Sequence, residues 1–196
     1  TATETFFPEK RLFFLEGQEV FVASPRADTR SQGVGNRGAP TTMVNTRRIG
    51  GKPVEPDEAP GLIIPERELV QPTELIGAAK LTGQYGQFRY GFLTAFEDEV
   101  KFDAIVDGES INIKADGNDY GVARFIYEDS GGGAYRALGF LSTAVMSPNR
   151  DAFTHGLDAH YLSEDGKLKV DGQIFMSDID EVDNGIGGFV DFEYTI

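Results

Sequence analysis

No cysteine and no tryptophan occur among the 196 residues, and histidine occurs only twice. Without cysteine the chain can form no disulfide bond, thiol nucleophile or thiolate metal site. No stretch reaches the roughly 18 consecutive apolar residues that a membrane-spanning helix needs. These absences exclude a helical membrane protein. They leave a membrane β-barrel open, because the strands of a barrel are not continuously apolar.

Basic residues are scarce in the second part of the chain. Residues 1–80 hold ten Lys and Arg against eleven Asp and Glu, whereas residues 81–196 hold eight against twenty-one, within a net charge of −14. So acidic a surface repels a phosphate backbone, and we expect no nucleic-acid partner. Divalent cations, a basic partner or simple solubility are the consequences that remain open.

Proline separates two unlike regions. Seven of the nine prolines lie between Pro25 and Pro72, in loop-like stretches such as SQGVGNRGAP and KPVEPDEAPG. We therefore predict an irregular N-terminal strap with Pro/Gly-rich loops over residues 1–73, and a β-meander over residues 74–196. No apolar leader stands at Thr1, so we expect that any secretion signal has already been removed.

From Leu75 onward apolar and polar residues alternate with period two, which indicates strands with two unlike faces. Turn sequences separate these runs: QYGQ, VDGES, ADGND, DSGGG, SPNRD, SEDGK and DNG. The predicted fold class is all-β, an antiparallel up-and-down meander of about seven to nine strands with no amphipathic helix. The runs 87–97, 134–146, 152–162, 167–177 and 186–196 are long enough to cross a bilayer, which takes about 9–11 residues per tilted strand.

The alternation fits two architectures, and these place the apolar face in opposite environments. In a soluble sandwich the apolar face points inward, whereas in a transmembrane barrel it meets lipid and the polar face lines a lumen. Strand length, and small residues such as Gly91, Ala95 and Gly156 on the polar face, favour the barrel. The residues predicted to face lipid are Phe88, Tyr90, Phe92, Ile174, Met176, Val190 and Phe192. Aromatic residues near strand ends, namely Phe88, Phe96, Tyr135, Tyr161 and Tyr194, are candidates for interfacial girdles.

No catalytic or cofactor-binding constellation is present. His155 and His160 form no metal-binding motif and alternate onto opposite faces, and no serine lies in a nucleophile elbow. Asp178, Asp180 and Asp183 in SDIDEVDNG are a weak candidate for a Ca²⁺ site, and a plain acidic hairpin loop is the alternative. Acidic residues on the polar face, namely Glu97, Asp158, Asp171, Asp191 and Glu193, leave glycoside hydrolysis open.

Four stretches carry a resemblance to a known family. They are FFPEKRLFFLEGQEVF (residues 6–21), TRRIGG (46–51), ELIGAAKLTGQYGQFRYGFLTA (74–95) and NDYGVARFIYED (118–129). In this order they resemble a bacterial outer-membrane β-barrel family of unknown function, whose members often carry a family 9-like carbohydrate-binding module ahead of the barrel. This chain is similar to the start of the barrel region and lacks that module.

The resemblance implies a location in the bacterial outer membrane or cell envelope, and a role in glycan handling as one further option. It supplies no catalytic residues. Because family chains continue past the equivalent of Ile196, we expect a fragment, or one chain of an assembly. The N-terminal segment then becomes a strap that joins a periplasmic part to the barrel. Its expected anchors are Phe6, Phe7, Phe13, Phe14 and Phe21, and Glu9, Lys10, Arg11 and Glu16 are expected to pair with polar lumen residues.

The function predicted from the sequence is a non-enzymatic envelope β-barrel component that acts as a pore, a scaffold or a docking surface. Its expected partners are the lipid bilayer and other envelope chains or the rest of the barrel, with glycan as an option. The alternative is a soluble, secreted β-sandwich that binds carbohydrate through Tyr120, Tyr127 and Tyr135. A glycoside hydrolase is the less favoured third hypothesis.

Overall fold

A computed structural model gives the fold, and it describes residues 9–23, 43–56 and 59–196. Two antiparallel sheets contain all the strands of these residues. The large sheet has the order β10-β9-β8-β7-β6-β3-β2, and the small sheet has the order β1-β4-β5. The all-β meander is therefore confirmed, and nine strands follow residue 74, within the predicted range.

The elements have the following bounds. The large sheet comprises β2 (Leu75–Tyr85), β3 (Phe88–Glu97), β6 (Asp119–Asp129), β7 (Tyr135–Met146), β8 (Ala152–Leu162), β9 (Leu168–Ile179) and β10 (Val182–Tyr194). The small sheet comprises β1 (Leu62–Ile63), β4 (Val100–Val106) and β5 (Glu109–Ala115). The short helical elements are α1 (Leu12–Leu15), η1 (Gln18–Phe21), η4 (Thr46–Arg48) and α2 (Glu66–Leu69).

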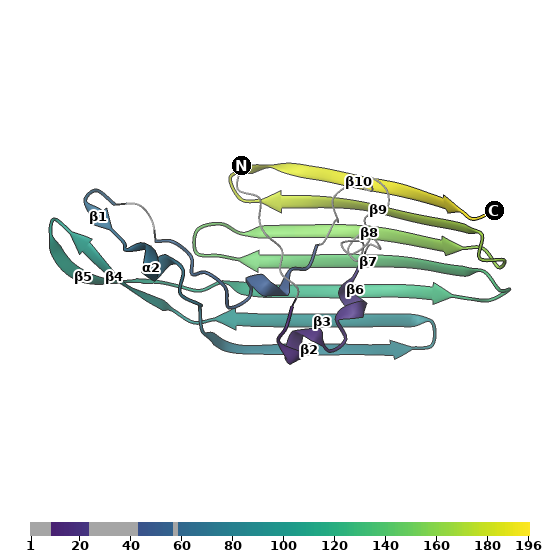
Figure 1. Ribbon diagram of the computed structural model, residues 1–196, viewed down its shortest axis with the longest axis horizontal. Coiled ribbons are helices and arrows are strands. Elements are labelled where there is room, and N and C mark those ends of the chain that lie inside the picture. The colour runs from purple at the N-terminus through teal and green to yellow at the C-terminus, as the bar shows by residue number, and fades with distance from the viewer. Residues whose placement is uncertain (1–8, 24–42, 57–58) are drawn as a thin grey trace.

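The large sheet is an open, seven-stranded layer, and its strands alternate in direction across Figure 1. The small sheet extends from one end of it, because the hairpin β4–β5 is inserted between β3 and β6. Within the described part of the chain, no helix is both long enough and apolar enough to cross a membrane.

Turn chemistry sets several of the connections. Asp107 and Gly108 both have positive φ, +52° and +86°, which is the backbone that a two-residue hairpin loop between β4 and β5 requires. One predicted turn is wrong. The DNG sequence at residues 183–185 lies within β10, and the hairpin from β9 instead turns at Asp180 and Glu181, where Glu181 has a φ of +62°. The pairing of β10 with β9 shifts its register between Val182 and Gly185, which keeps residues 183–185 within the strand.

The core lies between one face of the large sheet and the N-terminal strap. Here "strap" means the described residues 9–23 and 43–53, and the "inner face" is the sheet face that the strap covers. Figure 1 shows α1 and η1 lying across β2, β3 and β6. The buried cluster consists of Phe14 and Phe21 of the first strap segment, Ile49 of the second, and Leu93 and Ala95 of β3. Burial of these side chains fixes which face of the sheet is inside.

Candidate functional site: the two faces of the large sheet

The "outer face" is the face of the large sheet opposite the strap, and it is apolar over all seven strands. The strand register brings Phe92 beside Leu81 and Ala123, and Phe125 beside Phe140 and Leu157 in turn. All seven residues predicted to face lipid lie on this face. Phe92, Ile174, Val190 and Phe192 are 39%, 55%, 60% and 74% exposed, so they do not meet one another in a dry interior.

A row of aromatic residues lies toward one end of the outer face, and Phe96 lies on the same face at the other end of β3. Tyr85, Phe88 and Tyr127 form a row across β2, β3 and β6, and the rings of Phe88 and Tyr127 lie 5.1 Å apart. Tyr161 and Tyr194 lie on the same face near the same end of β8 and β10. Tyr135 differs from the girdle prediction, because it lies on the inner face and its hydroxyl donates to Glu128 at 2.7 Å.

A polar pair, Ser142 and His155, lies among the apolar side chains of the outer face. Ser142 and His155 face each other across β7 and β8 on the outer face, with Ser142 Oγ 2.9 Å from His155 Nδ1. The His155 ring stacks on Phe140, with 6.5 Å between ring centroids. Each of these polar groups therefore has a partner within the sheet, which lowers the cost of placing it on an apolar surface.

The inner face leaves space for the strap by using glycine. A Cβ on Gly91 would come within 2.9 Å of both Val20 and the ring of Phe21. A Cβ on Gly156 would come within 2.7 Å of the Met43 sulfur. Real Cβ atoms do not approach so closely. The small residues on this face are thus explained by the segment that packs against them.

The sheet holds the strap through its main chain. Lys80 Nζ donates to the carbonyl oxygens of Phe13 and Glu16, and Arg124 Nε donates to the Val20 carbonyl at 3.3 Å. The buried carboxylate of Glu97 accepts from the Gly50 N–H at 2.7 Å. Hydrogen bonds in which one partner is charged are roughly twice as strong as those between neutral groups. These contacts therefore fix the path of the strap.

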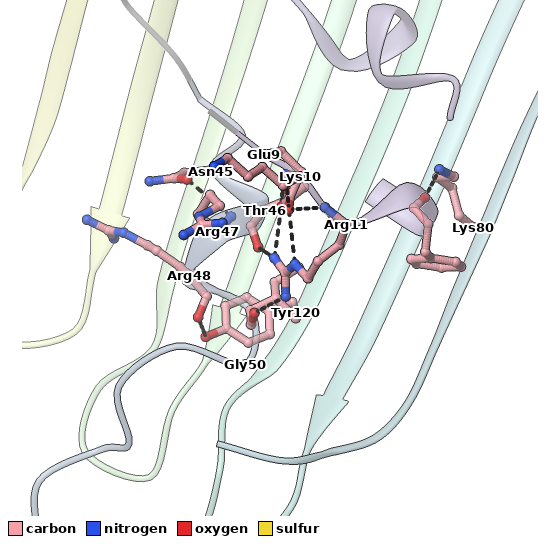
Figure 2. Close-up of polar contacts among 12 residues, drawn as sticks. Glu9, Lys10, Arg11, Asn45, Thr46, Arg47, Arg48, Gly50, Lys80 and Tyr120 are labelled. Carbon is pink, nitrogen blue, oxygen red and sulfur yellow. Dashed lines mark hydrogen bonds and ion pairs between the residues drawn. The ribbon is translucent and has the colours of Figure 1, made fainter. Parts of the chain in front are cut away.

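The second strap segment is held at Tyr120 and Glu97. Figure 2 shows the Tyr120 hydroxyl bonded to the Arg48 carbonyl. This hydroxyl lies 3.4 Å from the Arg48 carbonyl oxygen and 3.2 Å from Glu97 Oε1. Glu97 Oε2 also accepts from the main-chain and side-chain N–H groups of Asn118. This acid is therefore committed to hydrogen bonds that hold the strap and the end of β3.

Two charged side chains of the first strap segment, Glu9 and Arg11, pair with each other within the strap and not with the sheet as predicted. Figure 2 shows Arg11 between Glu9 and Thr46. Arg11 Nη2 donates to Glu9 Oε2 at 2.8 Å and to the Thr46 carbonyl at 2.6 Å, and Thr46 Oγ1 donates to Glu9 at 2.8 Å. Arg11 Nη1 donates to the Ile49 carbonyl at 2.6 Å. These bonds join the two strap segments to each other.

Those contacts set the pKa of the Glu9 carboxyl. Burial by itself raises this pKa, but the hydrogen bonds from Arg11 and Thr46 outweigh it and lower the value to about 2. The carboxylate form of Glu9 is therefore the form that the folded strap binds.

The predicted aromatic anchors divide into three groups. Phe14 and Phe21 are buried against the inner face. Phe13 is 41% exposed and instead packs its ring edge-on against Phe14, with the Lys80 ammonium 5.0 Å from its centroid. Phe6 and Phe7 lie outside the described residues.

A buried charge network crosses the inner face from β6 to β9. Arg124 donates to both carboxylate oxygens of Asp158, at 2.5 and 2.8 Å. His160 lies between two carboxylates, with Nε2 3.0 Å from Asp158 and Nδ1 2.7 Å from Asp171. Lys169 Nζ lies 3.2 Å from the other oxygen of Asp171. Each buried charge is thus paired, which is the condition for burying charge at tolerable cost.

The other predicted site residues are not brought together. Within the ranges that the structure describes, no three Asp, Glu or His side chains are grouped so that they could hold a metal ion, and this includes Asp178, Asp180 and Asp183. Tyr120 and Tyr135 lie on the inner face and Tyr127 lies on the outer face, so the three form no common stacking platform. His155 and His160 lie on opposite faces, as the alternation predicted.

Sequence reasoning missed Lys80 and Arg124, which hold the strap, and Gly139, which lies beside the network. The sequence did contain a signal for Arg124. Arg124 is the basic residue in the otherwise apolar and aromatic run VARFIY, where a buried, paired charge is the physical expectation. Its acidic partner could not be inferred, because Asp158 is 34 residues away.

Comparisons of the chain with known protein families, with curated proteins and with solved structures found no match in any of the three.

Proposed function

We propose that this chain forms part of the wall of a bacterial outer-membrane β-barrel and has no enzymatic activity. The outer face would contact the hydrocarbon core, and the inner face would carry the strap within the barrel. One observation carries the proposal. The strap lies on the inner face, while large aliphatic and aromatic side chains on the outer face stay exposed on all seven strands of the large sheet.

The outer face is unlike the solvated face of a soluble sheet. An antiparallel sheet in water packs its apolar face on a core and leaves its polar face solvated. Monomeric soluble proteins rarely expose a contiguous apolar patch larger than a few hundred Å². Here the strap lies on the inner face, where Lys80 and Arg124 bind its main chain, and the apolar side chains of the outer face stay uncovered. A bilayer supplies the surface that such a face requires.

Two further features support the membrane interpretation. The large-sheet strands contain 10 to 13 residues, which fits the length of a tilted strand that crosses a bilayer. The aromatic row of Tyr85, Phe88 and Tyr127 lies toward one end of the outer face, where an interfacial girdle belongs.

A scaffold or docking wall is favoured over an enzyme. Two inner-face acids that were candidates for glycoside hydrolysis form hydrogen bonds within the protein. Glu97 binds Gly50 and Asn118, and Asp158 binds Arg124 and His160. The strap also occupies the inner face above β2, β3 and β6 (Figure 1). We therefore assign this chain the role of supporting structure within an envelope barrel.

The test is membrane insertion of two matched variants. Val190 on the outer face and Ile63 in the small sheet are 60% and 61% exposed, so each can take a long charged side chain in water. Val190→Arg should lower the fraction of protein that inserts into vesicles of outer-membrane lipid, because arginine at the bilayer midplane costs about 2–4 kcal/mol. Ile63→Arg should insert like the wild type.

The proposal fails if the wild-type chain is fully soluble without detergent, or if both variants insert equally. A soluble dimer whose outer faces pack together is a distinct outcome. It would show twice the monomer mass in detergent-free buffer, and Val190→Arg would then reduce dimerisation.

A further inference from the structure

Charged side chains mark two borders on the outer face of the large sheet. Strand pairing joins the outer-face residues into rows that run across the strands, and neighbouring rows are two residues apart along each strand. Two of these rows, one near each end of the sheet, change from uncharged to charged residues part-way across. The positions of these changes fix the outline of the uncharged area, which is called the band below.

The first row lies near the end of the sheet where the hairpins β2–β3, β6–β7 and β8–β9 turn. It starts with Asp129 on β6 and Arg136 on β7, which form an ion pair with an N···O distance of 3.6 Å. It continues across β8, β9 and β10 with Tyr161, Val170 and Phe192. Phe192 is 74% exposed, and Tyr194, one row further along β10, is 67% exposed. The band therefore extends further toward this end on β10 than on β6 and β7.

The second row lies near the opposite end, and its charge is on the other side of the sheet. From β2 to β8 this row contains Ala79, Thr94, Gly121, Ala144 and Phe153. On β9 it contains Asp178. On β6 the charged residue at this end is Asp119, which lies one row further out. The band therefore extends further toward this end on β6 than on β9.

Both borders slant across the strands in the same sense. From β6 to β9 the second border moves by one row, about 7 Å along the strand, over three strand spacings, about 14 Å. The ratio gives an angle of about 25°. Met146 on β7 lies in the row of Asp119 and is still apolar and 45% exposed, so the slant is no smaller than this. A planar membrane surface crosses a sheet along such an oblique line when the strands are tilted, and barrel strands tilt by about 35–45°.

The separation of the two borders fits a hydrocarbon core. On β6, Asp119 and Asp129 are ten residues apart (129 − 119), which corresponds to about 33 Å along the strand. A tilt of about 25–45° reduces this to about 23–30 Å along the membrane normal. The apolar band of a transmembrane barrel is about 25 Å tall, and the hydrocarbon core is about 30 Å thick. The outer-face residues of β6 between the two carboxylates are Gly121, Ala123, Phe125 and Tyr127.

We propose that a lipid bilayer covers the outer face as an oblique band, bounded by Asp129 and Arg136 at one end of the strands and by Asp119 and Asp178 at the other. The large-sheet strands then cross the membrane at a tilt of at least about 25°. This inference rests on the proposed barrel wall and names the part of the outer face that lipid covers.

The experiment measures the depth of nitroxide labels on single cysteines, since the chain has no cysteine of its own. The whole chain is inserted into vesicles of outer-membrane lipid. Electron paramagnetic resonance then compares the access of lipid-soluble oxygen to each label with the access of a water-soluble nickel chelate. Two pairs of positions share a row and lie three strands apart, namely Arg136 with Phe192 and Gly121 with Asp178. A Cβ at Gly121 would meet only Ala144, at 3.8 Å, so this position accepts a cysteine.

The deeper label of each pair is the one on the uncharged side of its row. The label on Phe192→Cys should lie about 6–10 Å deeper than that on Arg136→Cys, the product of three strand spacings and a tilt of about 25–45°. The label on Gly121→Cys should lie deeper than that on Asp178→Cys by the same amount. A displacement of the sheet along its strands moves both members of a pair together, so it cannot produce this result. Thr143→Cys, on the inner face beside Ala144, is the control, and its label should have no access to lipid.

Labelling along β6 tests the two borders directly. Asp119→Cys and Asp129→Cys should react with a membrane-impermeant maleimide from opposite sides of the vesicle, and Ala123→Cys should react from neither side. Reaction of Ala123→Cys at the rate of the other two, or reaction of both border cysteines from one side, would overturn the assigned band.

The depth measurement also separates this inference from the barrel wall. Equal depths within both pairs, or a reversed order in both, would refute the oblique band, while access of lipid to the labels on Phe192→Cys and Gly121→Cys would still support the wall. If no outer-face label has access to lipid, the wall is refuted and the oblique band with it.

Discussion

Arg124 on β6 and Asp158 on β8 form a bidentate ion pair across the intervening strand β7, with N···O distances of 2.5 and 2.8 Å. The two strands do not pair with each other, so the guanidinium must pass over β7. It does so at Gly139, where a Cβ would lie 2.4 Å from both Arg124 and Asp158. The absence of a side chain at Gly139 is what allows this pair to form.

The first prediction concerns that glycine. Gly139→Ala should separate Arg124 from Asp158 and lower the free energy of unfolding by about 3–5 kcal/mol, the cost of breaking a buried ion pair. Denaturant unfolding of the refolded protein measures it. Gly121→Ala is the control, because its Cβ would meet only Ala144 at 3.8 Å. Equal stability of the two variants would contradict the account.

The second prediction is a double-mutant cycle on the ion pair. Both side chains are almost fully buried, 2% and 0% exposed. Arg124→Met should destabilise strongly, because it leaves Asp158 as a buried charge without its main partner. Adding Asp158→Leu should restore a large part of the loss, since an apolar pair of similar volume replaces the ionic one. Additive effects of the two substitutions would show that the residues act independently.

The third prediction concerns the docking of the strap. Gly91→Ala should displace the strap, because the new Cβ would come within 2.9 Å of Val20 and Phe21. Trypsin should then cleave after Arg11 faster than in the wild type, while the strand content by circular dichroism stays the same. Gly172→Ala, whose nearest contacts lie at 3.8 Å, provides the control and should leave cleavage unchanged. Wild-type cleavage rates in both variants would show that the strap does not rest on Gly91.

The fourth prediction is the pH dependence of the same docking. The pKa of Glu9 falls from an ordinary 4.5 to about 2 in the folded protein. A carboxyl whose pKa is lowered by folding stabilises the folded state above its ordinary pKa. That stabilisation is lost as the pH falls from 4.5 through about 2.

Fluorescence anisotropy of a dye attached to Leu12→Cys, an exposed strap position in a chain without other cysteines, measures this docking. Glu9→Gln should loosen the strap at about pH 6 and make much less difference from the wild type at about pH 2, where about half of the folded wild-type carboxyl is itself protonated. Glu19→Gln, an exposed glutamate of the same strap, should have no effect at either pH. A Glu9→Gln effect that is the same at both pH values would refute the assignment.

Several features of the fold follow from short-range signals in the sequence. The period-two alternation predicted the strands and their two faces, and Asp107-Gly108 predicted its hairpin turn. The same alternation placed His155 and His160 on opposite faces. These predictions succeed because neighbouring residues of a strand must point to opposite sides, so the information is local. The DNG turn failed because a register shift in β10 overrides local turn propensity.

What only the tertiary structure decided is which residues meet across the sheet and under the strap. The alternation showed that Gly91 belongs to the polar face, but gave no sign that it accommodates Phe21 or that Gly139 lets Arg124 reach Asp158. Nor could it show that Glu9 pairs within the strap and not with the sheet. Such contacts depend on the order of the strands and on the path of the strap, whose sequence has no periodicity. Both are set by packing between residues that are distant in the sequence.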